Sequence, residues 1–298
     1  RSSTTDARVD QPGPASKLCL SCHDGSLAIG LTLDRAMTEP IPMTHTFMPT
    51  GPSNLTNDLS DDHPVGFRYD RVLANRDRQI RPPELVDHRI KLGERGELEC
   101  TACHDPHNNE LGDFLRITDR NGALCLTCHD MDGWRHGSHA LSPRSVPVTV
   151  TNGEQLPYRS LADNACRSCH LSHSAPRRER LLYDRPSQLC ITCHDGISGP
   201  SVLSVLDQRS GHRVNKLREL RSTPENRLRA ARYVECTDCH NPHAAAKDLL
   251  KGPLGSLNAG PIVPPAMWAV PGVSLLGAAV EQAGFYYEVC FRCHGDRP

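Results

Sequence analysis

Several features of an ordinary globular domain are scarce in this chain. Aromatic residues make up 4% of its 298 residues, hydrophobic residues 37%, and five of the 34 basic residues are lysine. The mean hydropathy is −0.49. No stretch of 18 apolar residues is free of charges and prolines, which argues against a membrane-spanning helix. A chain this polar has too little apolar surface to build a large core by itself.

A strong charge of one sign is also missing. The formal net charge is −1 at pH 7, although 34 basic and 35 acidic residues are present. No basic patch with interleaved aromatic residues occurs, and such a patch is the usual mark of a nucleic-acid surface. Nucleic acid is therefore not an expected partner.

Cysteine occurs only in one short motif. All 14 cysteines belong to seven copies of Cys-X-X-Cys-His, and none is left over. This motif is the attachment signature of c-type haem. The copies are Cys19, Cys22 and His23; Cys100, Cys103 and His104; Cys125, Cys128 and His129; Cys166, Cys169 and His170; Cys190, Cys193 and His194; Cys236, Cys239 and His240; and Cys290, Cys293 and His294.

The spacing of the motif has a chemical reason. Two thiols add to the two vinyl groups along one porphyrin edge, and the histidine that follows is held beneath the ring, where its imidazole binds iron. Seven motifs predict seven haem c groups, one for about every 43 residues (298 divided by 7). Because the chain is so polar, we expect the haems to form the core and the haem-free chain to be largely unfolded.

Three other interpretations of paired cysteines fit less well. Zinc knuckles need a second cysteine pair, and they do not need a histidine after every pair. Disulfide-rich scaffolds are usually much shorter than 298 residues and do not repeat one fixed spacing. A thioredoxin-like Cys-X-X-Cys is expected once, within a βαβ pattern.

Histidines outside the motifs are candidate second ligands of the irons. The 16 histidines leave nine after the seven motif histidines, and seven six-coordinate irons need seven. We expect a histidine three residues after a motif to ligate the next haem, and a histidine upstream of a motif to ligate that motif's haem. In chain order, haems two to seven then receive His63, His107, His139, His173, His212 and His243. For the first haem we favour His45, with His88 or a neighbouring subunit as alternatives.

The motifs alternate between two types, which indicates an internal repeat. Motifs one, three and five read Leu-Cys-X-X-Cys-His-Asp, whereas motifs two, four and six carry the extra histidine three residues after the motif histidine. We expect a flexible arm over 1–16 and a single elongated domain over 17–298 built of haem pairs. The expected pair boundaries are about 17–118, 119–182, 183–250 and 251–298.

Regular secondary structure is expected to be sparse. Glycine and proline together account for 46 of 298 residues, and sustained helical periodicity is rare. We predict mostly irregular coil with short α-helices and little or no β-structure, with each motif on one or two helical turns. Candidate helices elsewhere are 216–220, 225–232 and 276–288. Residues 252–280 contain five prolines and no charged residue. We expect them either to cover the last two haems or to form a subunit contact.

Three runs carry a family resemblance: Leu-Cys-Leu-Ser-Cys-His-Asp-Gly at 18–25, His-Pro-Val-Gly at 63–66 and Glu-Cys-Thr-Ala-Cys-His-Asp-Pro-His at 99–107. They resemble the doubled-motif multihaem c-type cytochromes of metal-reducing and other anaerobic bacteria. The resemblance covers about residues 18–245 and the last motif. It implies bis-histidine haems in stacked and T-shaped pairs, and electron transfer. Some similar cytochromes polymerise into extracellular filaments in which the haems run continuously between subunits.

These observations favour an electron-transfer protein over an enzyme. If every iron has two imidazole ligands, no coordination position is open to a substrate, and the protein sets only spacing, orientation and potential. The alternative is a multihaem oxidoreductase of the nitrite or hydroxylamine type. Such an enzyme needs one open haem, often with lysine in place of the motif histidine, whereas all seven motifs here end in histidine.

The motifs also bear on location and partners. Haem attachment of this type takes place outside the cytoplasm, so we expect Arg1 to be a mature N-terminus after removal of a signal peptide. We expect an extracellular or cell-surface protein, with the periplasm as the alternative. The expected partners are other redox proteins or extracellular acceptors, and further copies of this chain in a homopolymer.

Overall fold

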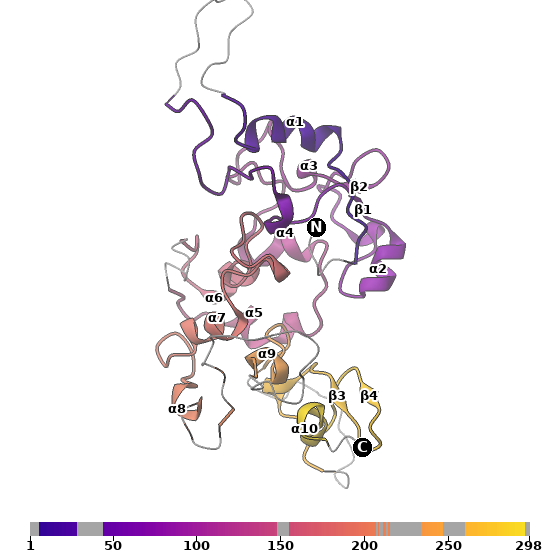
Figure 1. The fold of residues 1–298 in the computed structure, drawn as a ribbon, viewed down its shortest axis with the longest axis vertical. Helices are drawn as coiled ribbons and strands as arrows, with labels where there is room; N and C mark the ends of the chain where they lie inside the picture. The colour runs from indigo at the N-terminus through magenta and orange to yellow at the C-terminus, as the bar shows by residue number, and fades with distance from the viewer. Residues whose placement is uncertain are drawn as a thin grey trace, which may run out of the picture. The chain divides into compact units, whose positions relative to one another are not determined.

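A computed structural model of the chain describes residues 6–28, 44–147, 155–206, 208, 211–212, 214, 234–246 and 260–295. The candidate helices 216–220 and 225–232 lie outside these residues. The described chain consists mainly of turns and irregular coil, with short helices and two small antiparallel sheets of two strands each (Figure 1). The predicted fold class, irregular coil with short α-helices and little β-structure, is confirmed.

The regular elements are short. The α-helices are α1 Pro14–His23, α2 Arg71–Asp77, α3 Cys100–Cys103, α4 Ala123–Leu126, α5 Ser138–Leu141, α6 Leu161–Asn164, α7 Pro186–Cys193, α8 Leu203–Leu206, α9 Cys236–Cys239 and α10 Tyr286–His294. The strands are β1 Phe67–Arg68, β2 Glu97–Leu98, β3 Gly272–Val273 and β4 Ala279–Val280. Single 3-10 turns add Leu59–Asp61, Pro83–Leu85, Arg120–Gly122, Trp134–His136, Ala165–Ser168, Glu179–Leu181 and Pro265–Met267. None of the helices in the described ranges has the length and apolarity that crossing a membrane would require.

The chain forms two compact units from segments that are not consecutive. The first unit contains Arg1–Asp130 and Cys166–Tyr183, and the second contains Met131–Ala165 and Asp184–Pro298. Each unit therefore depends on contacts between segments far apart in the sequence. The single elongated domain expected from the repeat stays a prediction.

The core of the first unit holds the second motif in place. Strands β1 and β2 pair antiparallel, with Phe67 opposite Leu98. Around this pair a cluster of buried side chains forms from Phe67, Tyr69, Leu73, Ile90, Leu98, Ala102 and Ile117. Ala102 is fully buried and lies between the two cysteines of α3. The apolar cluster thus fixes the backbone of this motif directly.

The beginning of the described chain is packed against this core. Ala7 and Val9 contact the cluster, and the Asp10 amide donates to the Gly66 carbonyl at 3.2 Å. Gly66 has φ +77°, and a Cβ there would lie 2.8 Å from the Gln11 carbonyl oxygen, so the close approach needs glycine. The sequence predicts a flexible arm over 1–16. Within this range Ala7 and Val9 contact the cluster and α1 begins at Pro14, and the flexibility of the arm stays a prediction.

The core of the second unit surrounds the last motif. Val263, Met267, Val270, Ala283 and Val289 form a buried cluster. Strands β3 and β4 pair antiparallel beside α10, with Gly272 opposite Val280 (Figure 1). The described part of the uncharged segment 252–280 therefore packs on the helix that carries Cys290 and Cys293.

The predicted helix over 276–288 is wrong. Strand β4 occupies Ala279–Val280, and α10 begins only at Tyr286. The buried Glu288 carboxylate explains this start, since it accepts hydrogen bonds from the amides of Gly284 at 2.7 Å and Phe285 at 3.0 Å. These two amides lie just before the helix, where no carbonyl of α10 can accept from them, and the Glu288 carboxylate satisfies both.

We predict that truncation of Leu98 destabilises the first unit. Leu98 is 6% exposed and Leu85 is 64% exposed. Leu98→Ala should lower the free energy of unfolding by about 2–5 kcal/mol, because it leaves a cavity in the cluster. The control Leu85→Ala should change it by less than about 0.5 kcal/mol. Denaturant titration of the haem-loaded protein measures both, and equal effects would contradict the assigned core.

Candidate haem-attachment sites

Each Cys-X-X-Cys-His motif is folded into one tight helical turn. The motif cysteines lie on α1, α3, α7, α9 and α10, on α4 together with the turn that follows it, and on the 3-10 turn Ala165–Ser168 together with the turn residue Cys169 that follows it. In five motifs the amide of the histidine donates to the carbonyl of the first cysteine at 2.9–3.0 Å; these histidines are His104, His129, His170, His194 and His240. This is an i to i−4 bond, so it places the first cysteine and the histidine on one face of the turn.

Backbone carbonyls orient the imidazoles of the motif histidines. A carbonyl oxygen can only accept, so the Nδ1 atom of each ring donates, and in the neutral ring the Nε2 atom is the one that carries the lone pair. Metal-bound histidines typically hold their second ring nitrogen in this way. The contacts are His23 to Ser53 at 2.7 Å, His104 to Asp113 at 2.8 Å, His170 to Arg180 at 2.8 Å, His194 to Pro200 at 3.2 Å and His240 to Ala266 at 2.8 Å.

Four motif histidines have a second imidazole at a fixed separation. The ring centroids are 6.2 Å apart for His104 and His173, for His129 and His63, and for His194 and His139, and 6.0 Å apart for His294 and His212. Two imidazoles on opposite faces of one metal would have centroids about 6.2 Å apart, because a metal–nitrogen bond is about 2.0 Å and each centroid lies about 1.1 Å behind its nitrogen. The four separations fit an iron between each pair of rings.

The second rings are oriented like the first. The Nδ1 atom of His139 donates to the Pro242 carbonyl at 2.7 Å, and that of His63 donates to the Pro64 carbonyl at 3.1 Å. His173 has a different acceptor: the Nδ1 atom of His173 donates to the Asp62 carboxylate at 3.2 Å. In each case the Nε2 atom is left for a metal.

The four ring pairs differ from the order expected along the chain. The sequence predicts His63 for the second haem and His173 for the fifth, whereas these rings lie beside the third and second motif histidines, respectively. It predicts His139 for the fourth haem and His212 for the sixth, whereas they lie beside the fifth and seventh motif histidines. Every observed pair joins residues of one unit. Long-range packing brings these rings together, and a rule based on the nearest motif cannot predict it.

The other candidate ligands are either exposed or in contact with a ring that is not a motif histidine. His45, His88 and His107 are exposed, and so is His136, which the sequence rule leaves unassigned. His107 is expected for the third haem, but His63 lies beside that motif's His129. His243 is expected for the seventh haem, but its ring lies 6.1 Å from Trp134 in an edge-on contact, and His212 lies beside His294.

Burial keeps several of these imidazoles neutral. Desolvation lowers the pKa of His63, His104, His170 and His194 below the ordinary value for histidine, although a backbone hydrogen bond acts in the opposite direction on each. Neutral imidazole is the form that binds a metal. The environment of these rings therefore suits ligation at neutral pH.

The first cysteines of successive motifs meet in pairs. A hydrogen bond with the Cys190 thiol lowers the pKa of Cys236 below the ordinary value for a thiol, which favours the thiolate, the reactive form. Such thiol contacts join motifs one and two, three and four, and five and six; the pairs are Cys19 and Cys100, Cys125 and Cys166, and Cys190 and Cys236. The attachment edges of these motifs therefore lie side by side.

A buried serine and glutamate brace the first of these contacts. The Ser16 hydroxyl of α1 donates to the Glu99 carboxylate, and the Gly13 amide donates to the same carboxylate at 3.0 Å. The Cys100 amide in turn donates to the Ser16 hydroxyl at 3.0 Å. Ser16 is fully buried, and Glu99 is 5% exposed. The bridge ties α1 to α3 by polar groups that are all satisfied.

The same bridge recurs in the second unit. The Ser187 hydroxyl of α7 donates to Glu235, and the Ser187 amide donates to it at 3.1 Å. The Cys236 amide lies 3.4 Å from the Ser187 hydroxyl oxygen and donates to it. Sequence reasoning missed this bridge. Its signal is a serine three residues before the first cysteine of one motif and a glutamate directly before the first cysteine of the next. In motifs three and four these positions are Gly122 and Ala165.

Neither the disulfide nor the zinc interpretation gains support. The fourteen cysteines all lie in the described ranges, and none of them forms a disulfide there. Within the described part of the chain, no group of three or more histidine, cysteine, aspartate or glutamate side chains is arranged to hold a metal ion. A haem iron needs only two protein ligands, since the porphyrin supplies the others. The paired rings and the one-sided motif turns therefore fit haem better than a bare metal.

Comparison with known proteins agrees with the motif chemistry. The family described as the doubled CXXCH motif matches residues 94–133 and 159–199. These ranges contain motifs two to five. No curated protein matches the chain. The family match indicates covalently bound haem c and supports a multihaem c-type cytochrome, a class that generally serves in electron transfer.

We predict that Ser16→Ala destabilises the paired motifs of the first unit. The change removes a donor from the buried Glu99 carboxylate and an acceptor from the Cys100 amide, which should cost about 1–3 kcal/mol. Ser21 on the same helix donates to the Leu18 carbonyl from an exposed position, so the control Ser21→Ala should cost less than about 0.5 kcal/mol. Denaturant unfolding of the haem-loaded protein compares them. If the free energy of unfolding of Ser16→Ala equals that of the Ser21→Ala control, the bridge does not stabilise the paired motifs.

Proposed function

We propose that this chain transfers electrons through seven haem c groups, each with two histidine ligands. The observation that carries the proposal is the centroid separation of 6.0–6.2 Å in four pairs of imidazoles. One ring of each pair is a motif histidine. Where an Nδ1 partner is described, it leaves Nε2 available, so both rings can bind one iron.

The chain's residues divide the work of holding each haem. Two cysteines of a motif would form the thioether bonds, and the motif histidine would be the first axial ligand. We assign the second axial position to His173 in the second motif, His63 in the third, His139 in the fifth and His212 in the seventh. The first, fourth and sixth motifs would draw on His45, His107, His243, His88 or a neighbouring subunit.

Haem c supplies reversible one-electron chemistry when it is bound. With two imidazoles on an iron, no position is open to a substrate, which favours transfer over catalysis. The chain's contribution is then to fix the position of each group and to set its potential through hydrogen bonds and burial. The thiol contacts between motifs and the serine–glutamate bridges support close spacing between successive groups.

We further propose that the protein works outside the cytoplasm, at the cell surface or in the extracellular space, where redox proteins or extracellular acceptors would be its partners. Covalent haem attachment takes place outside the cytoplasm, which supports this location. Self-association into a homopolymer is part of the proposal. Exposed Leu275 and Leu276, in the turn between β3 and β4, are 68% and 95% exposed and support an apolar contact between subunits.

The number of haems and their ligation can be tested on the purified protein. Intact mass should exceed that of the polypeptide by seven haem masses, and the dithionite-reduced spectrum should show the sharp α-band of low-spin ferrous haem c. A lower count would contradict the heptahaem assignment. A high-spin signal in the resting protein would contradict double histidine ligation, and it would favour an oxidoreductase with one open haem.

We predict that His139→Ala leaves one haem without its second ligand. The ring of His139 lies 6.2 Å from that of His194, so about one seventh of the low-spin ferric signal should be replaced by a high-spin signal. His136 lies three residues before His139 in the sequence and is exposed, so it serves as the matched control. Electron paramagnetic resonance compares His139→Ala with His136→Ala at equal haem content. Identical low-spin signals in the two variants would exclude His139 as a ligand.

A further inference from the structure

The hydrogen-bond acceptor of the His173 ring differs from those of the four other paired rings whose Nδ1 partners the structure describes. In the pairs described above, the Nδ1 atoms of His63, His104, His139 and His194 donate to backbone carbonyls. The Nδ1 atom of His173 instead donates to a carboxylate, Oδ1 of Asp62, at 3.2 Å. This contact joins residues 111 positions apart in the chain.

Asp62 is buried and held against His173 from both sides. It is 4% exposed, and its Oδ1 atom also accepts a hydrogen bond from the Ser174 amide at 3.0 Å. Its neighbours are bonded to the same segment: the Ala175 amide donates to the Asp61 carbonyl, and the His63 amide donates to the Ser172 carbonyl, both at 2.8 Å. The carboxylate is therefore fixed on the ring by the backbone on each side of it.

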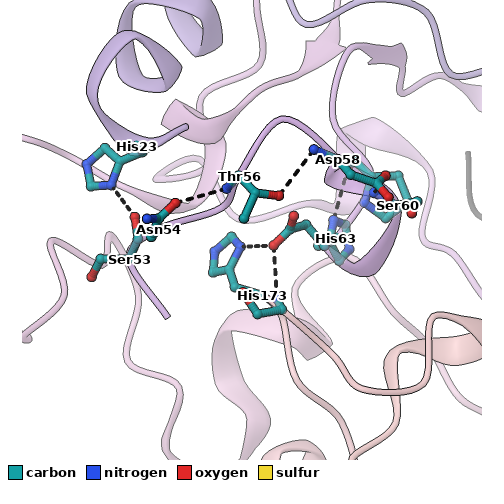
Figure 2. A network of polar contacts seen from close by, with 11 residues as sticks. His23, Ser53, Asn54, Thr56, Asp58, Ser60, His63 and His173 are labelled. Carbon is teal, nitrogen blue, oxygen red and sulfur yellow. Dashed lines mark hydrogen bonds and ion pairs between the residues drawn. The ribbon is translucent and has the colours of Figure 1, made fainter. Parts of the chain in front are cut away.

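The loop that carries Asp62 is stiffened by its own side chains (Figure 2). The Thr56 amide donates to the Asn54 side chain at 3.2 Å, the Asp58 amide to the Thr56 hydroxyl at 3.2 Å, and the Ser60 amide to the Asp58 carboxylate at 3.1 Å. Local bonds of this kind hold a loop without a helix. The position of the carboxylate thus does not depend on a mobile turn.

We propose that Asp62 is a positioning residue that lowers the reduction potential of the iron between His104 and His173. This inference rests on the proposed ligand pair. A carboxylate that accepts a hydrogen bond from an imidazole N–H raises the electron-donating strength of the other ring nitrogen, and a neutral carbonyl does so less. Stronger donation stabilises the ferric state.

Burial strengthens this effect. The second carboxylate oxygen, Oδ2, is buried and makes no hydrogen bond to any described residue. Its negative charge is poorly screened, because charges act more strongly in the interior than in water. A negative charge beside an iron ligand also favours the ferric state. Both effects act in the same direction, so they lower the potential of this iron relative to one whose two imidazoles both donate to backbone carbonyls, as those of His139 and His194 do.

Asp62→Asn tests the inference in the haem-loaded protein. Asparagine has the same shape and keeps an acceptor for the Ser174 amide, but it removes the charge. One midpoint potential should rise by about 59 mV or more, which corresponds to a tenfold change in the equilibrium constant of a one-electron couple. The other potentials should stay the same. Spectroelectrochemical titration measures the potentials, and electron paramagnetic resonance should show changed g-values for one low-spin haem.

Asp58→Asn is the matched control. Asp58 lies in the same loop but is exposed, and its carboxylate pairs with Arg178 at 2.8 Å. This variant should leave every potential unchanged. Asp62→Glu keeps the carboxylate charge, so this variant should keep the low midpoint potential of the wild type. If Asp62→Asn does not accumulate, the wild type and Asp62→Glu still test the role of Asp62. In both proteins the electron paramagnetic resonance signal of one ferric haem should show imidazolate character, because the carboxylate accepts the hydrogen bond from Nδ1 of His173. Its absence in both would overturn the inference.

The outcomes separate this inference from the proposed function. A wild-type protein with the wrong haem count or without low-spin signals would contradict the proposed function itself. Intact haem content with the same potentials in Asp62→Asn and the wild type would overturn only the role of Asp62. A rise in potential that the Asp58 control shares would also overturn it, because the effect would then come from the loop and not from the buried charge.

Discussion

The structure depends on the hydrogen bond that closes each Cys-X-X-Cys-His turn. The amide of the motif histidine donates to the carbonyl of the first cysteine, four residues earlier, at 2.9–3.0 Å in five motifs. This bond puts the thiols and the imidazole on one side of a very short helix. The local geometry of attachment is therefore contained within each five-residue motif, and the rest of the fold places one turn beside another.

Polar contacts accomplish much of that placement, because the chain has few large apolar side chains. The apolar clusters around Leu98 and Val270 each support one motif. Elsewhere, Ser16 with Glu99 and Ser187 with Glu235 tie paired motifs together through buried groups. Asp62 holds His173 in the same manner. Such networks specify one arrangement best when every buried group has a partner, and Oδ2 of Asp62 is one of the buried atoms for which no hydrogen bond is found among the described residues.

Sequence reasoning succeeded where the pattern was local. The repeat of one five-residue motif predicted irregular coil with short helices, and the structure has that fold class. It was less successful at the boundary of an element. Glu288, in the first turn of α10, accepts hydrogen bonds from the amides just before the helix, which therefore begins at Tyr286, and the helix predicted over 276–288 does not form. The close approach of Gln11 to Gly66 depends instead on residues far apart in the sequence, which a local pattern does not bring together.

The sequence by itself determined the chemistry of attachment, because two cysteines and a histidine at fixed spacing meet on one helical turn whatever surrounds them. Only the tertiary structure decided which second imidazole lies beside four of the motif histidines. His63 lies beside His129 and His173 beside His104, although a rule of nearest motifs pairs them otherwise. Ring pairing depends on how segments 55 to 82 residues apart pack, as His139 and His194 (194 minus 139) and His212 and His294 (294 minus 212) do. That packing is a property of the folded chain and not of any one repeat.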